Sequence, residues 1–264
     1  MTPGDTYIRE ITPEEITPGR PLREAFLELH AVWIDRGLKR WLALLRPDAP
    51  LPSMLVGAFA GNALEGVVIG IWADAPCDRF DSLFDIEVGP GIAARPRRGA
   101  WHLISVTTAP SAGAHGLGRH LLARVLVALD ATGHREARTL SPAVGLPALA
   151  AAWPGSLEDA VLHAARIDGR PVLQVMRLHL GGGARLEAVL RRSRSEDAAS
   201  GLVNLRFRYA TDPVARSAQK ERWQRWIAAR SGTSTPVADG FDGAPLVRAV
   251  GDDRLVWDGP PVNG

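Results

Sequence analysis

Apolar residues near the start of the chain recur with the spacing of an α-helix. Over residues 22–45 they fall three or four positions apart, as at Phe26, Leu29 and Trp33. This spacing places them along one face of a helix. Gly37 interrupts the pattern, so we predict two consecutive helices in this part of the chain.

Extended patterns replace the helical spacing after these helices. Two apolar runs, Met54–Phe59 and Leu64–Trp72, flank a turn that contains Gly61 and Asn62. This arrangement is typical of a β-hairpin. A β-branched run over residues 100–110 ends at a proline and predicts a third strand.

The second half of the chain alternates between helical and extended patterns. A helix is predicted over residues 117–129, where apolar side chains at 117, 121, 122, 125, 126 and 129 share one face. The later patterns predict a strand over 137–142, a helical segment with a proline break over 146–169, two strands around a glycine turn over 171–191, a strand over 201–210 and a helix over 214–230. This order predicts an α/β fold in which helices flank a mixed sheet.

The chain is long enough to form a sizeable hydrophobic core, with 264 residues of which 46% are hydrophobic. We expect a polar N-terminal segment over residues 1–21, one elaborated domain over 22–210 and a C-terminal segment over 211–264. Gly, Pro, Ser and Asp dominate after residue 231. The last segment is therefore predicted to be a helix followed by a tail or linker.

The charge and the cysteine content indicate which partners and which cellular compartment to expect. Thirty-one basic and 29 acidic residues give a net charge of +2 without a dense basic stripe, so we expect no nucleic-acid partner. The single cysteine, Cys77, excludes a disulfide within the chain and is typical of a reducing compartment. No apolar run reaches the roughly 18 residues of a membrane span. We therefore expect a cytoplasmic protein without membrane contact, and no Cys/His spacing indicates a metal site.

A glycine turn between a predicted strand and a predicted helix is a candidate binding site for a phosphorylated ligand. The sequence AHGLGRHLL places Gly116 and Gly118 at this turn, with Arg119 directly after it. Backbone N–H groups at the start of a helix can hold a pyrophosphate. A turn of this kind is also a common structural feature, so the signal alone is weak.

The motifs around this turn resemble those of the GNAT superfamily. The strand, glycine turn and helix are similar to its acetyl-CoA-binding core, although Gly113 stands where Arg or Gln is usual. The stretch LGRHLLARVLVALDATGHREARTLSP resembles malonyl-CoA decarboxylase. The stretch LHLGGGARLEAVLRRSRSED resembles the GNAT-like domains of polyketide synthase loading modules, with matches in order at His179, Gly183, Ala184, Arg194 and Asp197. The resemblance covers roughly residues 22–209 and assigns 22–210 to a GNAT-like catalytic domain.

This resemblance implies a decarboxylase that acts on a malonyl or methylmalonyl thioester and supplies a starter unit for polyketide synthesis. The thioester would be carried by coenzyme A or by the phosphopantetheine of an acyl carrier protein, with no tightly bound cofactor. The resemblance also implies that Thr139 and His179 form the catalytic pair. A hydroxyl can orient the carboxylate that is lost, and an imidazole can stabilise the enolate or protonate its carbon.

Further site residues follow from position and from the same resemblance. Ser141 lies two residues after Thr139 and shares its face in an extended strand. Trp33 would line the acyl pocket, with core packing as the alternative. Arg194 would contact the phosphate of the handle, with a solvent-exposed position as the alternative. Gly116, Gly118 and Arg119 would bind the coenzyme A or phosphopantetheine handle.

Two other classes of function remain open from sequence. The first is acyl transfer: an S-acetyltransferase that moves acetyl from coenzyme A to a carrier-protein thiol, or a GNAT N-acetyltransferase. Transfer to an amine is disfavoured because Glu65 is the only carboxylate near the hairpin that could act as a base. The second class is a non-catalytic docking domain, which the presence of both Thr139 and His179 disfavours.

Overall fold

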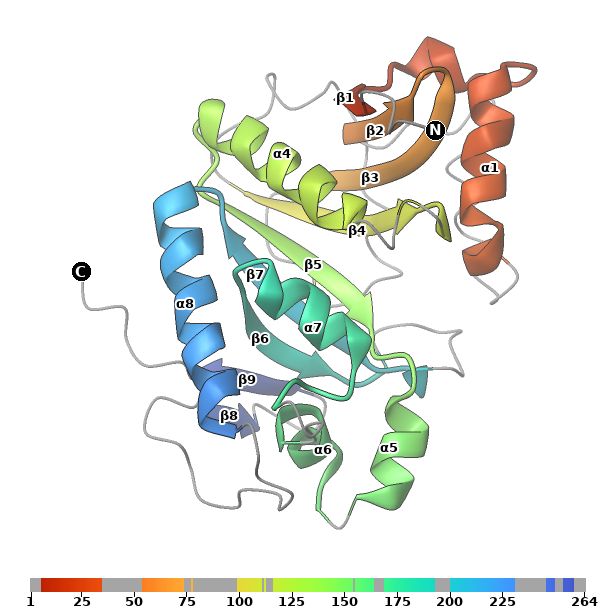
Figure 1. Ribbon diagram of the computed structural model, residues 1–264. Helices are drawn as coiled ribbons and strands as arrows, with labels where there is room; N and C mark the ends of the chain where they lie inside the picture. Colours follow the sequence, from red (N-terminus) through yellow and green to blue (C-terminus); the bar gives the residue numbers. More distant parts are fainter. Residues whose placement is uncertain are drawn as a thin grey trace. The chain divides into compact units, whose positions relative to one another are not determined.

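The computed structural model describes residues 6–34, 54–73, 77, 99–110, 112, 116–153, 155–163, 169–192, 200–230, 246–249 and 254–258. The chain divides into two compact units, Met1–Arg138 and Thr139–Gly264. Figure 1 labels the helices and strands of both units. Each unit is described by itself.

Four antiparallel strands form the sheet of the first unit. They follow one another in the order β1 (Thr6–Glu10), β2 (Met54–Ala60), β3 (Ala63–Ala73) and β4 (Ala100–Thr108) (Figure 1). The predicted hairpin and the third predicted strand are confirmed as β2, β3 and β4. Strand β1 lies in the segment for which only polar character was expected. It was missed because an edge strand that is half exposed carries no continuous apolar run.

Helices pack their apolar faces on this sheet. The first unit contains the short 3₁₀ helix η1 (Pro13–Ile16), α1 (Pro21–Ile34) and α4 (Leu117–Ala131). Helix α4 packs against β2, β3 and β4, whereas α1 packs against β3 and β4. The predicted apolar face of α4 is confirmed, because its buried residues are Leu117, Leu121, Leu122, Val125, Leu126 and Leu129. The second helix predicted before residue 45 lies outside the described residues.

Strand β5 (Glu136–Pro142) leads into the second unit, as predicted. The helices that follow are α5 (Leu146–Ala152), α6 (Leu157–His163), α7 (Gln174–Gly181) and α8 (Pro213–Arg230). The other strands are β6 (Ala184–Leu190), β7 (Asn204–Ala210), β8 (Leu246–Ala249) and β9 (Arg254–Asp258). Strand β6 pairs antiparallel with β7 and with β9, and β8 pairs with β9.

Two predictions for the second unit are wrong. The segment before the glycine turn, which contains His179, is helix α7 and not a strand. Short apolar runs do not distinguish a strand from a buried helix, and the buried residues Met176, His179 and Leu180 have helical spacing. In the C-terminal tail, where a linker was expected, β8 and β9 extend the ladder that starts at β6.

A close packing contact fixes the turn that follows α7. Gly183 has φ +87°, and a Cβ atom built on it would lie 2.6 Å from the backbone oxygen of Arg216 in α8. A side chain at this position would therefore be strained both by its φ and by the contact. Helix α8 also packs on β6 and β7, so this glycine joins the end of α7 to the helix layer of the second unit.

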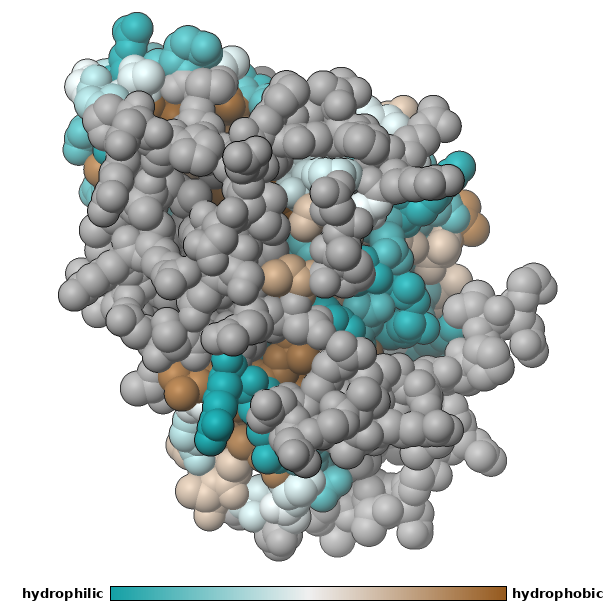
Figure 2. Space-filling model, turned by 180° about the vertical axis from the view of Figure 1, so that it is seen from behind, coloured by the Kyte–Doolittle hydropathy of each residue, from teal (hydrophilic) through white to brown (hydrophobic). Residues whose placement is uncertain are grey.

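Few large apolar side chains are exposed on the described part of the chain. The exposed large hydrophobic residues are Tyr7, Val127, Val144, Val172 and Val214, which are distant from one another in sequence. Figure 2 shows hydrophilic surface beside smaller hydrophobic areas on the face seen from behind. Among the described helices, none combines the length and the apolar composition that crossing a bilayer requires.

His30 links the packing of α1 to the pH dependence of stability. Its side chain is completely buried, stacks on Phe26 at 4.2 Å between ring centroids and contacts the Phe26 carbonyl oxygen through Nδ1 at 2.8 Å. Burial lowers the pKa of His30 from 6.5 to about 4. The unfolded chain therefore binds more protons than the folded chain between these two pH values, and stability falls as pH falls through this window.

We predict that His30→Gln flattens this acid dependence. Between about pH 6.5 and pH 4, the slope of the unfolding free energy should decrease by about 1 kcal/mol per pH unit, because one titrating group has been removed. Urea unfolding followed by circular dichroism at several pH values measures the slope. An unchanged slope would show that His30 is equally protonated in the folded and unfolded chains.

Candidate functional site

A line of four polar side chains lies in the interior of the second unit. Thr139 and Ser141 are on β5, His179 is on α7 and Tyr209 is on β7. Thr139, His179 and Tyr209 are buried, whereas Ser141 is half-buried. Strand alternation explains why both β5 hydroxyls point the same way, because residues two apart share a face of the sheet.

Hydrogen bonds connect these four side chains in one line. The Ser141 hydroxyl donates to Thr139 Oγ1 at 3.3 Å, and Ser141 Oγ lies 2.8 Å from Nε2 of His179. On the other side of the ring, His179 Nδ1 lies 2.7 Å from the Tyr209 hydroxyl. Both nitrogens of the imidazole are therefore held by hydroxyl groups, which can act as donors or as acceptors.

An aromatic ring covers the imidazole. Phe207, two residues before Tyr209 on β7, stacks on the His179 ring with 4.5 Å between centroids and 30° between planes. Burial lowers the pKa of His179 from 6.5 to about 3. The imidazole is therefore neutral at physiological pH, with one nitrogen carrying a proton and the other accepting one.

A neutral, doubly anchored imidazole next to two hydroxyls can carry out three chemical tasks. It can donate a hydrogen bond to an oxygen that becomes negative, as neutral histidines do in other enzymes. The hydroxyls can orient a polar substrate group. The pair formed by Ser141 and His179 also has the spacing of a nucleophile and its base.

The structure brings together only part of the predicted site. Thr139 and His179 were expected to act as a pair, and Ser141 to lie beside them. Instead Ser141 makes the direct contact with the imidazole, and Thr139 is reached through Ser141. The sequence analysis missed Tyr209. Its position two residues after Phe207, on the same face of a strongly alternating strand, is the signal that could have indicated it.

The predicted glycine turn lies at the start of α4, in the first unit. Gly116 is the N-cap residue, with φ +78°, and a Cβ atom on it would meet no atom within 4 Å. This open backbone is suited to a close approach by a ligand. Gly118 has only ordinary contacts at 3.5 and 3.6 Å, so nothing in its surroundings requires a glycine. Arg119 is exposed directly after it.

Three residues named from sequence cannot be placed in this site. Arg194 and Gly113 lie outside the described residues. Trp33 belongs to the last turn of α1, but its side chain is not among those described. Their expected roles remain predictions. Within the described part of the chain, no group of His, Cys, Asp or Glu side chains could hold a metal ion.

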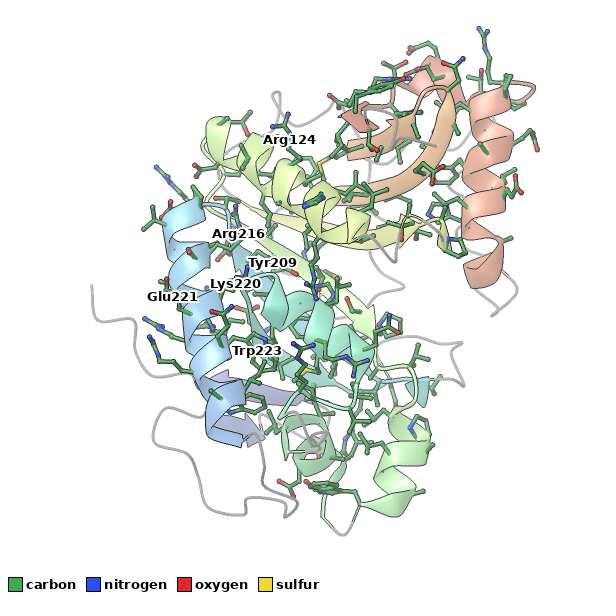
Figure 3. All side chains as sticks on the ribbon, viewed as in Figure 1. Arg124, Tyr209, Arg216, Lys220, Glu221 and Trp223 are labelled. Carbon is green, nitrogen blue, oxygen red and sulfur yellow. The ribbon has the colours of Figure 1, made fainter. Side chains whose placement is uncertain are left out.

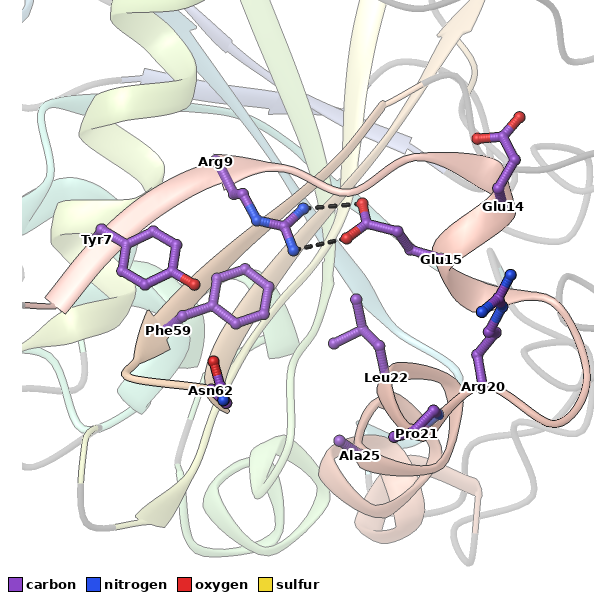
Figure 4. A pocket seen from close by; sticks show the side chains of 10 residues that line it. All are labelled: Tyr7, Arg9, Glu14, Glu15, Arg20, Pro21, Leu22, Ala25, Phe59 and Asn62. Carbon is purple, nitrogen blue, oxygen red and sulfur yellow. Dashed lines mark hydrogen bonds and ion pairs between the residues drawn. The ribbon is translucent and has the colours of Figure 1, made fainter.

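A hollow lies in the first unit, with a volume of about 460 Å³. Figure 4 shows its lining, which is formed by Tyr7, Arg9, Glu14, Glu15, Arg20, Pro21, Leu22, Ala25, Phe59 and Asn62. Arg9 donates two hydrogen bonds to Glu15, at 2.8 and 2.6 Å, and lies over the Phe59 ring at 4.6 Å. Arg9 and Glu15 therefore neutralise each other in the hollow. The line of hydrogen-bonded side chains around His179 is the stronger candidate for the functional site.

Solved structures with the same fold include several decarboxylases. The loading GNATL domain of CurA from Lyngbya majuscula is 14% identical, with a TM-score of 0.56, and the match covers 78% of this chain and 98% of that one. The GphF GNAT-like decarboxylase in complex with isobutyryl-CoA is 20% identical, with a TM-score of 0.54. The match covers 78% of this chain and 100% of that one. Malonyl-CoA decarboxylase from Agrobacterium vitis is 18% identical, with a TM-score of 0.61. The match covers 86% of this chain and 67% of that one.

These likenesses confirm the predicted GNAT fold, with a mixed sheet flanked by helices. The sequence motifs had indicated a resemblance to GNAT-like loading domains and to malonyl-CoA decarboxylases. The structural matches include both kinds of protein, at low sequence identity. No protein-family model matches the chain, and no curated protein matches its sequence.

We predict that the ring of His179 does not titrate between pH 8 and pH 5. Burial keeps its pKa near 3, so the neutral form persists throughout this range. In two-dimensional NMR spectra of the protein labelled at histidine, the His179 ring signals should stay constant over these pH values. The His179→Gln variant identifies those signals by their loss. A titration midpoint near 6.5 would contradict the buried, neutral state.

Proposed function

We propose that this protein is a GNAT-like decarboxylase of malonyl or methylmalonyl thioesters, and that it produces an acetyl or propionyl starter unit. The observation that carries this proposal is the buried line of hydroxyls and neutral imidazole from Thr139 through Ser141 and His179 to Tyr209. The decarboxylases among the structures of the same fold support it. One of them was solved with an acyl-CoA, which supports a thioester substrate.

The chemistry of decarboxylation requires few groups. The bond between the carboxylate carbon and the α-carbon breaks, carbon dioxide leaves and the bonding electrons form an enolate with the thioester carbonyl. A proton then adds to the α-carbon. The site must therefore orient the carboxylate, stabilise the negative oxygen of the enolate and supply one proton.

The four residues of the hydrogen-bonded line are suited to these tasks. In the proposal, the hydroxyls of Thr139 and Ser141 hold the carboxylate so that the breaking bond stands perpendicular to the thioester plane. The imidazole of His179, neutral because of its burial, donates a hydrogen bond to the enolate oxygen. The proton that adds to the α-carbon comes from solvent. Tyr209 holds Nδ1 and so sets the orientation of the ring. Apolar surroundings such as Phe207 strengthen these interactions.

The glycine turn at the start of α4 is the proposed contact for the handle of the thioester. The open backbone at Gly116 and the start of α4 can accept the phosphates of coenzyme A or phosphopantetheine. Arg119 can add a charge-assisted contact from its exposed position. An acyl carrier protein is the proposed partner that brings the phosphopantetheine.

One observation favours a second function, the transfer of acetyl from coenzyme A to a carrier-protein thiol. The distance of 2.8 Å between Ser141 Oγ and His179 Nε2 is also that of a nucleophile and a general base. A general base works best when its pKa lies near the working pH, however. The pKa of His179, about 3, makes the imidazole a weak base and therefore favours decarboxylation.

We predict that four single variants reduce turnover in a graded order. His179→Gln should lower decarboxylation by at least about 100-fold, the usual size of a lost hydrogen bond to a developing negative oxygen. Ser141→Ala and Thr139→Val should lower kcat about 10-fold or more, with KM changed less, because orientation matters mainly in the transition state. Tyr209→Phe should cause a smaller loss. Carbon dioxide release from malonyl-CoA measures each effect.

The control for this series is the stability of each variant. The loss of one buried hydrogen bond should cost about 1 kcal/mol, so all four variants should remain folded at 25 °C. A His179→Gln protein that decarboxylates within tenfold of the parent would exclude the assigned role. An effect of Thr139→Val on KM alone would make Thr139 a binding residue.

A paired assay distinguishes decarboxylation from transfer. One sample contains malonyl-carrier protein, and the other contains acetyl-CoA with reduced carrier protein. We expect carbon dioxide loss in the first sample and little acetyl-carrier protein in the second, because His179 is too weak a base to form a thiolate. Mass spectrometry of the carrier protein measures both products. Rapid acetylation without decarboxylation would establish the acyltransferase instead.

A further inference from the structure

The proton of the His179 ring can sit on either of its two nitrogens, and the choice decides what the imidazole can do. The ring is neutral, so one nitrogen donates a hydrogen bond and the other accepts one. Nε2 faces Ser141 on β5, and Nδ1 faces Tyr209 on β7. A proton on Nε2 makes the ring a donor toward β5, whereas a bare Nε2 would make it a base toward Ser141.

One contact in the hydrogen-bonded line has a fixed direction. Between the two hydroxyls of β5, Ser141 is the donor and Thr139 Oγ1 is the acceptor, at 3.3 Å. A serine hydroxyl carries a single hydrogen. Because that hydrogen is directed at Thr139, Ser141 Oγ accepts in its 2.8 Å contact with His179 Nε2. The proton of the ring is therefore on Nε2.

The contact on the other side of the ring agrees with this direction. Tyr209 is completely buried, and its place in the second unit is marked in Figure 3. Its hydroxyl lies 2.7 Å from Nδ1 of His179 but 3.5 Å from the His179 carbonyl oxygen, so Nδ1 is the better acceptor. A phenol is also more acidic than an alcohol, which makes Tyr209 the stronger donor of the two hydroxyls that flank the ring.

The opposite placement of the proton would weaken the line at both ends. With the proton on Nδ1, Tyr209 would have to accept at 2.7 Å, and its own hydrogen would lose this short contact. Ser141 would have to turn its hydrogen from Thr139 to Nε2, which would remove the donor from Thr139. Buried groups that lose a hydrogen bond cost free energy, because they have also left water.

We propose that Tyr209 is a positioning residue, which donates to Nδ1 and thereby holds the proton of His179 on Nε2. This inference rests on the proposed function. The donors then point one way along the line, from Tyr209 to Thr139, and aligned hydrogen bonds polarise and strengthen one another. The Nε2–H hydrogen that Ser141 accepts in the free protein is the one that the enolate oxygen accepts in the reaction.

This direction of the hydrogen bonds also separates decarboxylation from acyl transfer. A nitrogen that already carries a proton cannot take one from Ser141 or from the thiol of a carrier protein. The bare nitrogen of His179, Nδ1, lies on the other side of the ring and is covered by Tyr209. The tautomer therefore makes the imidazole a donor to an anion, for a reason that is independent of its basicity.

Nitrogen-15 NMR of the free protein tests the tautomer without any substrate. A bare ring nitrogen resonates far downfield of a protonated one, and spectra that correlate the ring nitrogens with the ring C–H protons distinguish Nδ1 from Nε2. We expect the downfield resonance for Nδ1 and the upfield resonance for Nε2. The His179→Gln variant identifies both by their loss. The reverse pattern, or two intermediate resonances, would overturn the inference.

Two matched variants test which hydroxyl acts on which nitrogen. In Tyr209→Phe, the Nδ1 resonance should move, because this nitrogen loses its hydrogen-bond donor. In Ser141→Ala, the Nε2 resonance should move and Nδ1 should stay bare, because Ser141 only accepts. A Tyr209→Phe protein with an unchanged Nδ1 resonance would show that Tyr209 does not donate to the ring.

Kinetics complete the test of the positioning role. Tyr209→Phe should lower kcat for malonyl-CoA about fivefold, the effect of one lost hydrogen bond, with KM nearly unchanged because Tyr209 acts through His179. A change in KM alone would contradict this role. Carbon dioxide release by a protein with the proton on Nδ1 would refute the inference and retain the decarboxylase. The expected tautomer without carbon dioxide release would do the reverse.

Discussion

The candidate site depends on the burial of one imidazole between two hydroxyl groups. Without hydrogen-bonding partners, a buried histidine would cost several kcal/mol of desolvation. Ser141 and Tyr209 offset this cost by contacting Nε2 and Nδ1, and Phe207 covers the ring. Because burial disfavours the charged imidazolium, the pKa of His179 falls to about 3. The chemistry of the site is therefore that of a neutral hydrogen-bonding ring, and every other assignment follows from this state.

The sequence predicted the features that depend on residues close together along the chain, and missed those that depend on residues far apart. The apolar face of α4 and the β2–β3 hairpin were predicted correctly, because helical spacing and strand alternation are local patterns. The contacts of His179 are not local: Ser141 and Tyr209 are 38 and 30 residues away in the sequence. Motif resemblance indicated His179 and the β5 hydroxyls, but no pattern showed which hydroxyl makes the direct contact.

The errors in predicted secondary structure have a related cause. The segment before the glycine turn is short and apolar, and such a segment suits a strand or a buried helix equally well. In the folded chain it is α7, whose last turn carries His179 and ends where Gly182 donates its N–H to the His179 carbonyl oxygen. Helical geometry here matters for the site, because it directs the imidazole toward β5 and β7 from a rigid element.

The turn after α7 connects the candidate catalytic residue to helix α8. Gly183 allows the backbone of Arg216 to approach so closely that no other residue could replace it without movement of α8. Arg216 in turn holds the end of β7 through the carbonyl oxygens of Ala210 and Thr211, next to Tyr209. The same few contacts therefore fix the end of α7, the start of α8 and the strand that carries the Tyr209 hydroxyl. Helix α8 therefore packs directly against α7, which carries the imidazole, and against β7, which carries its Tyr209 partner.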